Sequence, residues 1–254
     1  MPNEQETSVY IVAHKDFDAP QLSGYLPILA GASRNTARIA LKDDTGDNIS
    51  AKNPEYCELT AQYWVWKNRA ESDSNVGFVH YRRYFYTDPH KTQIVPAAQF
   101  SRDLTEFDVI LPEPCVLTKT IGDQFAQFHN VDDLETVRAI LQERCPEYVG
   151  AFDALMRSHS LHAYNMFVMP KPRFDAYMTW LFGILDEAER RIDVSAYDSY
   201  NHRLFGFLAE RLLNVWVNAR KLRVKEYPVY MPDQSAWKEN LRARVKSLMF
   251  AHTH

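Results

Sequence analysis

Glycine is scarce in this chain, and several kinds of phosphate-binding site are therefore absent. Only 8 glycines occur among 254 residues, and neither a GxGxxG nor a GxxxxGK[ST] pattern is present. Dinucleotide-dependent oxidoreductases and P-loop enzymes are disfavoured, because both need glycines where the backbone approaches phosphate. The chain also lacks a GxSxG pattern, which disfavours the common serine hydrolases.

Cysteine is equally rare, and the chain lacks a CxxC pair. The three cysteines are odd in number and far apart in the sequence: Cys57, Cys115 and Cys145. This spacing suggests neither a disulfide framework nor a structural zinc site. We expect reduced thiols, as in a cytoplasmic protein.

Neither a basic surplus nor a long apolar run is present. The formal net charge is -4 and the pI is about 6.1, which disfavours a nucleic-acid-binding protein. The N-terminal segment is acidic and polar, unlike a signal peptide. The longest apolar stretches are far shorter than the roughly 20 residues that span a bilayer. We therefore expect a cytoplasmic protein.

Short apolar runs alternate with helical patterns along the chain. Strands are predicted at residues 8–13, 25–29, 76–81, 107–111 and 164–169. Helices are predicted at residues 53–68, from residue 132 onward, and at residues 174–190 and 202–219. This alternation predicts an α/β layered fold, and the absence of a clear linker favours one domain.

Basic residues follow two of the predicted strands. His14 and Lys15 come after the first strand, and His80, Arg82 and Arg83 come at the end of the third. Ligands of open α/β sheets bind outside the carboxyl ends of the strands, where arginine suits a diphosphate. The alternative for Arg82 and Arg83 is a pair of solvated charges.

The segment from residue 43 to residue 53 is polar and rich in turn-forming residues. Its carboxylates, Asp43, Asp44 and Asp47, could bind a ribose or a metal ion. A turn around Gly46 explains them almost as well.

Four blocks of sequence carry a resemblance that covers nearly the whole chain. They are DDTGDNISAKNPEYCELTAQYWVWKN (43–68), VGFVHYRRYF (76–85), YNMFVMPKPRFDAYMTWLF (164–182) and FGFLAERLLNVWV (205–217). In this order they resemble bacterial capsular and exopolysaccharide glycosyltransferases, long described as a domain of unknown function. The resemblance implies a single GT-A-like α/β domain with a mostly parallel central sheet flanked by helices. Residues 8–170 would bind the nucleotide sugar, and the mainly helical residues 171–254 would form the acceptor side.

The resemblance also implies an activity. The enzyme would be a hexosyltransferase that moves a sugar from a UDP-sugar to a hydroxyl of a lipid-linked oligosaccharide, in capsule, exopolysaccharide or O-antigen synthesis. Some members are associated with galactofuranosyl transfer, so UDP-galactofuranose and UDP-galactose are candidate donors. Better-known GT-A enzymes hold a divalent metal ion with an Asp-x-Asp motif, whereas His80 and Arg82 stand at that place here. We therefore predict that no metal ion is required, with Mn²⁺ or Mg²⁺ as the alternative.

The polar residues after the predicted strands and the family resemblance together assign the site residues. We assign His14, Lys15, Asp44 and Asn48 to the nucleotide and His80, Arg82 and Arg83 to the diphosphate. The resemblance places Glu58 near the donor sugar and Asn165 near the acceptor. Each of these two residues could instead be an ordinary hydrogen-bonding residue at an element edge.

The candidate catalytic base is Glu210, the one acid within an otherwise apolar helix. A carboxylate there must face a cleft or be paired, because burying it alone is costly. Arg211 is expected to point away from it, and a structural ion pair with a distant residue is the alternative. Asp198, in the turn before this helix, is the second candidate for the base.

Two other classes of protein remain open. A nucleotidyltransferase would need a glycine-rich phosphate loop near the N-terminus. A non-catalytic carbohydrate-binding component of a polysaccharide assembly complex would bind glycan but not UDP. The C-terminal segment has Trp237, Leu241, Val245 and Leu248 on one helical face with basic residues around it. That helix could lie on anionic lipid, or pack on the domain or on another subunit.

Overall fold

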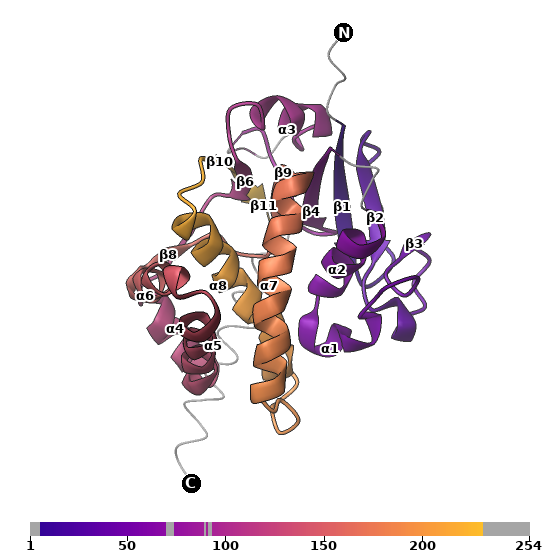
Figure 1. Cartoon of the computed structure of the whole chain (residues 1–254). Coiled ribbons are helices and arrows are strands. Elements are labelled where there is room, and N and C mark those ends of the chain that lie inside the picture. The colour runs from indigo at the N-terminus through magenta and orange to yellow at the C-terminus, as the bar shows by residue number, and fades with distance from the viewer. Residues whose placement is uncertain (1–5, 70–73, 89, 91–92, 231–254) are drawn as a thin grey trace.

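The computed structural model describes residues 6–69, 74–88, 90 and 93–230, and these form a helix-flanked sheet of seven strands (Figure 1). The strand order is β10-β6-β9-β4-β1-β2-β3. The strands are β1 (Thr7–Ala13), β2 (Tyr25–Leu29), β3 (Leu41–Lys42), β4 (Asn75–His80), β6 (Val109–Pro112), β9 (Phe167–Pro170) and β10 (Val224–Tyr227). Two small antiparallel ribbons pair β5 (Tyr84–Phe85) with β11 (Val229–Tyr230), and β7 (Cys115–Val116) with β8 (Ser160–Leu161).

Strand direction within the sheet decides which residues meet at its edge. Strand β1 is parallel to both β2 and β4, whereas β9 is antiparallel to both β4 and β6. The carboxyl ends of β1 and β4 therefore lie beside the start of β9. The carboxyl end of β9, at Pro170, lies at the opposite edge, and the reversed direction brings Tyr164 and Asn165 to the ligand edge instead.

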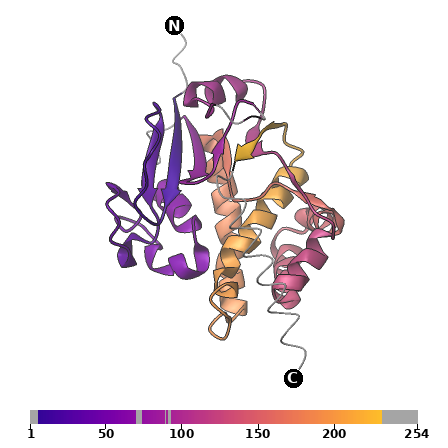
Figure 2. The same ribbon diagram turned by 180° about the vertical axis from the view of Figure 1, so that it is seen from behind.

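Eight α-helices are found among the described residues. They are α1 (Asn53–Tyr56), α2 (Leu59–Asn68), α3 (Ala97–Asp103), α4 (Ile121–Phe128), α5 (Val131–Arg144), α6 (Val149–Arg157), α7 (Lys171–Arg191) and α8 (Leu204–Ala219). Single 3-10 turns precede some of them, including η2 (Ser50–Lys52) and η4 (Asn201–Arg203). Helices α7 and α8 run side by side, and the group α4–α6 lies beyond α8, away from β1 and β2 (Figures 1 and 2).

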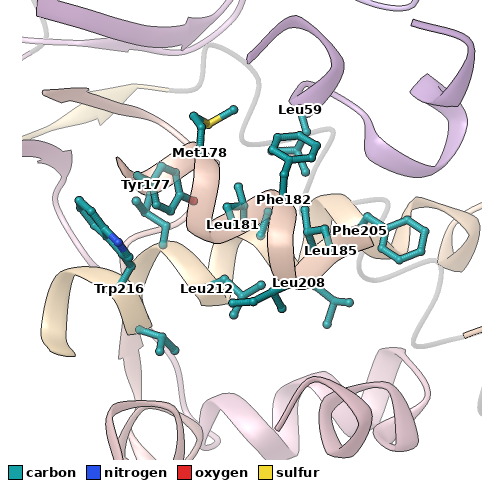
Figure 3. Close-up of a cluster of buried hydrophobic side chains, with 14 of the residues drawn as sticks. Leu59, Tyr177, Met178, Leu181, Phe182, Leu185, Phe205, Leu208, Leu212 and Trp216 are labelled. Carbon is teal, nitrogen blue, oxygen red and sulfur yellow. The ribbon is translucent and has the colours of Figure 1, made fainter. Parts of the chain in front are cut away.

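The sheet is buried on both faces, as the continuous apolar strands require. Tyr10, on β1, packs with Phe78 and Phe167 in the core under the long helices. Val9 and Ile11, which alternate with it, belong to a second core that includes Phe100 of α3. Leu181 and Leu212 lie in the cluster between α7 and α8 (Figure 3). One core thus joins the sheet to the helical part of the chain, and the expected α/β fold, with a mostly parallel central sheet flanked by helices, is confirmed.

Several element boundaries differ from those predicted. The helix predicted at residues 53–68 is broken at Cys57, whose φ of 52° cannot continue a helix. Helix α5 begins one residue before Asp132, since Asn130 rather than Asp132 caps it. Helices α3, α4 and α6 were not predicted. The C-terminal segment that could lie on anionic lipid, or pack on the domain or on another subunit, lies outside the described residues.

No helix in the described ranges has both the length and the apolar character needed to cross a bilayer.

Candidate functional site

Basic side chains gather around Tyr81 at the carboxyl ends of β1 and β4. The ring of His14 lies 5.1 Å from the Tyr81 ring, edge to face. The Lys15 ammonium and the Arg82 guanidinium lie 5.7 Å and 4.9 Å from the centre of the same ring. His14, Lys15 and Arg82 are all exposed. The structure therefore brings three of the predicted donor-binding residues together on one accessible edge.

A tight turn after β4 positions Arg82 and Arg83. The backbone N–H of His80 donates to the carbonyl of Arg83 at 3.1 Å, and the N–H of Arg83 donates to the carbonyl of His80 at 2.9 Å. Arg82 is exposed at the tip of this turn, and the half-buried Arg83 lies 4.7 Å from the centre of the Tyr164 ring. Cations held over aromatic rings keep their charge, so both remain suited to an anionic ligand.

His80 has a different environment from the other basic residues. Its Nε2 lies 2.7 Å from the carbonyl oxygen of Tyr164, and because a carbonyl only accepts, Nε2 carries the proton. Burial, with the nearby Arg83 charge, lowers the pKa of His80 to about 4. The structure gives this neutral ring a positioning role toward Tyr164. Its predicted contact with a diphosphate stays a prediction.

Tyr164 and Asn165 form an unusual turn before β9. Both have positive φ, 77° and 49°, although neither is glycine. For Tyr164 such backbone costs about 1–2 kcal/mol, whereas asparagine adopts it more readily, and strain of this kind clusters at functional sites. The N–H of Tyr164 donates to Oε1 of Glu210 at 2.9 Å, and Nδ2 of Asn165 donates to Oε1 of Glu58 at 2.7 Å. Two adjacent residues thus hold two predicted site carboxylates.

The two carboxylates have raised pKa values. Burial raises the pKa of Glu58, and the hydrogen bond from Asn165 opposes this rise. Burial also raises the pKa of Glu210, and the negative charge of Glu58 adds to that increase while Arg211 opposes it. Both side chains are half-buried rather than sealed, and Glu210 is 22% exposed. A raised pKa on an accessible carboxylate suits proton transfer near neutral pH.

The partner of Glu210 differs from the one expected. Arg211 was predicted to point away, yet its Nη1 lies 3.4 Å from Oε2 of Glu210. The shorter bonds of Arg211 go to the carbonyl of Phe207 at 2.9 Å and to Oε1 of Gln124 at 3.0 Å. The long side chain of Arg211 bends toward Glu210 although its Cβ points to another side of the helix. The expectation that Arg211 points away from Glu210 was therefore wrong. The contact is long enough to leave Oε2 of Glu210 weakly held.

Other predicted residues lie in structural hydrogen bonds. Asn165 is 1% exposed and donates to both Glu58 and the carbonyl of Gly206, so the structure shows it positioning Glu58. Its assignment to the acceptor stays a prediction. Asp198 is exposed, and its Oδ1 accepts from the N–H groups of Tyr200 and Asn201 at the turn before α8.

The polar loop after β3 is internally bonded. Asp43 is buried, and its oxygens accept from the N–H groups of Gly31 and Ala32 and from the hydroxyl of Ser50. Asn48 is exposed and closes its own turn, accepting from Ser50 and donating to the carbonyl of Gly46. Asp44 is half-buried in the same loop. The turn interpretation therefore accounts for Asp43, and nucleotide binding by Asp44 and Asn48 stays a prediction.

The residues at the end of β4 do not fit a divalent metal ion. Tyr81, Arg82 and Arg83 offer no carboxylate, and guanidinium groups repel a cation. His80 directs its Nε2 proton to Tyr164. Across the described ranges, His, Cys, Asp and Glu side chains nowhere gather in a group of three that could hold a metal ion.

Sequence reasoning missed Tyr164, Cys57 and Arg203. The Nε of Arg203 donates to Sγ of Cys57 at 3.1 Å, beside Glu58. Arg203 lies just before α8 and Cys57 in a helix break, so neither stands at a strand end. Tyr164 gave no signal in the sequence, because its place at the ligand edge depends on the reversed direction of β9.

A largely parallel sheet with one reversed strand, flanked by helices, is an α/β fold of GT-A-like type, and cations and carboxylates lie at its ligand edge. The chain belongs to the family described as a domain of unknown function (DUF4422), whose model matches residues 8–221. It is similar to a solved structure described as the apo form of WbbM, a bifunctional glycosyltransferase, with 32% identity and a TM-score of 0.81. The match covers 88% of this chain and 45% of that one, so this chain spans less than half of its length. No curated protein matches. The expected glycosyltransferase-like family of unknown function is thus confirmed.

Proposed function

We propose that this chain is a glycosyltransferase that moves a sugar from a UDP-sugar to an acceptor hydroxyl. One observation carries the proposal: Lys15, Arg82 and Arg83 lie at the same sheet edge as the paired carboxylates Glu58 and Glu210. Cations there suit a diphosphate, and a carboxylate beside them suits the proton of a hydroxyl. The similarity to a bifunctional glycosyltransferase supports the same class of reaction.

The reaction requires one bond to form and one to break. The acceptor oxygen bonds to the anomeric carbon while the bond from that carbon to the diphosphate oxygen breaks, and UDP leaves with both electrons. Arg82 and Arg83 would stabilise the charge that develops on the leaving diphosphate. Glu210 would take the acceptor proton, because its Oε2 is weakly held and its pKa is raised by burial. Asp198, bonded to the turn before α8, is the less favoured base.

We propose that fixed arginines replace the metal ion used by better-known GT-A enzymes. By the family resemblance, His80 and Arg82 stand where an Asp-x-Asp would hold the cation, and the arginines would supply positive charge without a bound ion. Activity is then expected to survive EDTA. A sharp dependence on Mn²⁺ or Mg²⁺ would contradict this, and would direct attention to Asp44 and Asp47.

The donor sugar and acceptor rest on the family resemblance. UDP-galactofuranose and UDP-galactose are the first donors to test, with a lipid-linked oligosaccharide as the acceptor in capsule, exopolysaccharide or O-antigen synthesis. A groove lined by Lys52, Glu55, Glu189 and His202, among others, offers a polar route for a glycan. His202 and Glu55, 3.5 Å apart, are close in sequence to Arg203 and Cys57 at the site edge.

Two measurements test the proposal. UDP should raise the melting temperature, because a ligand that binds only the folded state stabilises it by mass action. Purified protein is then incubated with a panel of nucleotide sugars and oligosaccharide acceptors, and products are identified by mass spectrometry. A glycan product would support the proposal. Glycan binding without any response to UDP would instead support a non-catalytic component of an assembly complex.

A further inference from the structure

Arg203 lies at the ligand edge but comes from the helical part of the chain. It is the last residue of η4, directly before α8. Its Nε donates to Sγ of Cys57 at 3.1 Å, and its guanidinium carbon lies 5.5 Å from the centre of the Phe207 ring. The residue is nevertheless exposed. The guanidinium is thus held from two sides and still accessible.

The charge of Arg203 influences the basic residues at the carboxyl ends of β1 and β4. It contributes, after burial and nearer charges, to the lowered pKa values of His14 after β1 and His80 at the end of β4. It also opposes the rise in the pKa of Glu58 that burial causes. An arginine that influences all three groups lies within electrostatic range of both strand ends and of the carboxylate pair.

The charge of Arg203 is balanced only at longer range, by Glu58. Arginines elsewhere pair with carboxylates, as Arg138 does with Asp153 at 2.7 Å. Within the part of the chain that the structure describes, Arg203 forms no ion pair with a carboxylate. Burial raises the pKa of Cys57 to about 11, so its thiol is neutral at physiological pH. A neutral thiol is a weak acceptor, and a phosphate oxygen would replace it readily.

We propose that Arg203 binds the diphosphate of the donor from the helical side of the site, and that Cys57 holds it there without neutralising it. This inference rests on the proposed nucleoside-diphosphate site. Arg82 and Arg83 lie directly after β4, and Arg203, directly before α8, adds a third planar guanidinium group. Three such groups suit the negative charge of a diphosphate better than two.

The first experiment is calorimetric titration of UDP, and of uridine for comparison, into the full chain. Arg203→Ala should weaken UDP binding by roughly 10- to 100-fold, as expected for charge-assisted bonds to phosphate, and leave uridine binding unchanged. Arg203→Lys should recover part of the loss. Arg220→Ala is the matched control, because Arg220 lies at the far end of α8 and bonds to the Tyr148 hydroxyl.

The outcomes separate the two proposals. If Arg203→Ala and Arg203→Lys bind UDP as tightly as the unaltered chain, the role of Arg203 is wrong while the UDP site stands. If uridine binding falls as much as UDP binding, the contact is not with phosphate and the inference also fails. If the unaltered chain does not bind UDP, both proposals fail.

A second pair of variants tests the part played by Cys57. The backbone at this position, with φ of 52° and ψ of -128°, favours glycine, so asparagine and aspartate carry the same strain as cysteine there and are compared only with each other. Cys57→Asn offers a neutral acceptor to Arg203, and Cys57→Asp offers a charged one of the same shape. We expect Cys57→Asp to bind UDP several-fold more weakly than Cys57→Asn, since a carboxylate would neutralise the guanidinium. Equal affinities would overturn the inference.

Discussion

Replacing Glu210 by glutamine tests the catalytic assignment with little disturbance of the fold. The Oε1 of Glu210 accepts from the N–H of Tyr164 at 2.9 Å, and a glutamine carbonyl oxygen can accept the same bond. Glutamine also removes the cost of burying a charge, which is the cause of the raised pKa of Glu210. The free energy of unfolding should therefore change by less than about 1 kcal/mol, within the range of conservative substitutions.

The effect on turnover should be much larger than the effect on stability. Loss of a general base costs about 100-fold to 10,000-fold in rate, or roughly 2.7 kcal/mol or more of transition-state stabilisation. We expect kcat to fall at least about 100-fold while UDP affinity is retained, because Glu210 does not bind the diphosphate in the proposed mechanism. The assay is product formation by mass spectrometry, with UDP affinity measured separately by calorimetry.

The pH profile adds a second readout. A base acts when deprotonated, so kcat of the unaltered chain should rise with pH through the pKa of Glu210, which burial raises above the ordinary value of 4.5. This acidic limb should disappear in Glu210→Gln. Glu143→Gln is the matched control, because Glu143 lies on α5 and pairs with Arg191 on the surface. Near-normal turnover of Glu210→Gln would eliminate it as the base, and failure to fold would show a structural role.

Three further predictions concern binding and stability. Arg82→Ala and Arg83→Ala should each weaken UDP binding by about 1.5–3 kcal/mol, measured by calorimetry, and unchanged affinity would contradict their assignment. Burial lowers the pKa of His80 from 6.5 to about 4, so acid favours the unfolded state, in which His80 binds a proton more readily. The free energy of unfolding should be at its full value above pH 6.5 and should fall by at most about 3 kcal/mol as the pH falls through 4. Urea unfolding at several pH values should show that loss, and His80→Gln should flatten it. Gly77→Ala should destabilise the sheet by about 1–3 kcal/mol, because the new Cβ would lie 2.9 Å from Cγ2 of Val168. An unchanged urea midpoint would show that β9 shifts to make room for the methyl group.

The sheet and part of its ligand edge could be predicted from the sequence. Strands β1 and β4 are buried on both faces, so they appear in the sequence as continuous apolar runs that stop at a polar residue. Each run ends where the site begins, and this pattern located His14 and Arg82 without knowledge of the topology. The direction of β9 could not be predicted in this way, because a short apolar run has the same composition in either direction.

The acidic half of the site was only partly predictable. Glu210 was identified because a lone acid in an apolar helix needs a partner, and the structure supplies one in the N–H of Tyr164. That backbone donor could not be foreseen, because it depends on a positive φ at a tyrosine. Propensity favours glycine or asparagine in such backbone, so the sequence gives no warning of it at Tyr164 or at Cys57. The contact between Cys57 and Arg203 joins residues 146 positions apart, beyond any local pattern.

The turn at Tyr164 and Asn165 bonds to both predicted site carboxylates at this edge. The carbonyl of Tyr164 accepts from His80 and its N–H donates to Glu210, while the carbonyl of Asn165 accepts from Gln62 of α2. These bonds fix the backbone in a conformation that would otherwise be unfavourable, and they do so from β4, α8 and α2 at once. The same turn also holds Glu58 through the Asn165 side chain, so both carboxylates are bonded to one segment of backbone. Burial at this edge raises the pKa of both acids, and the binding of an anion to the neighbouring arginines would raise their proton affinity further.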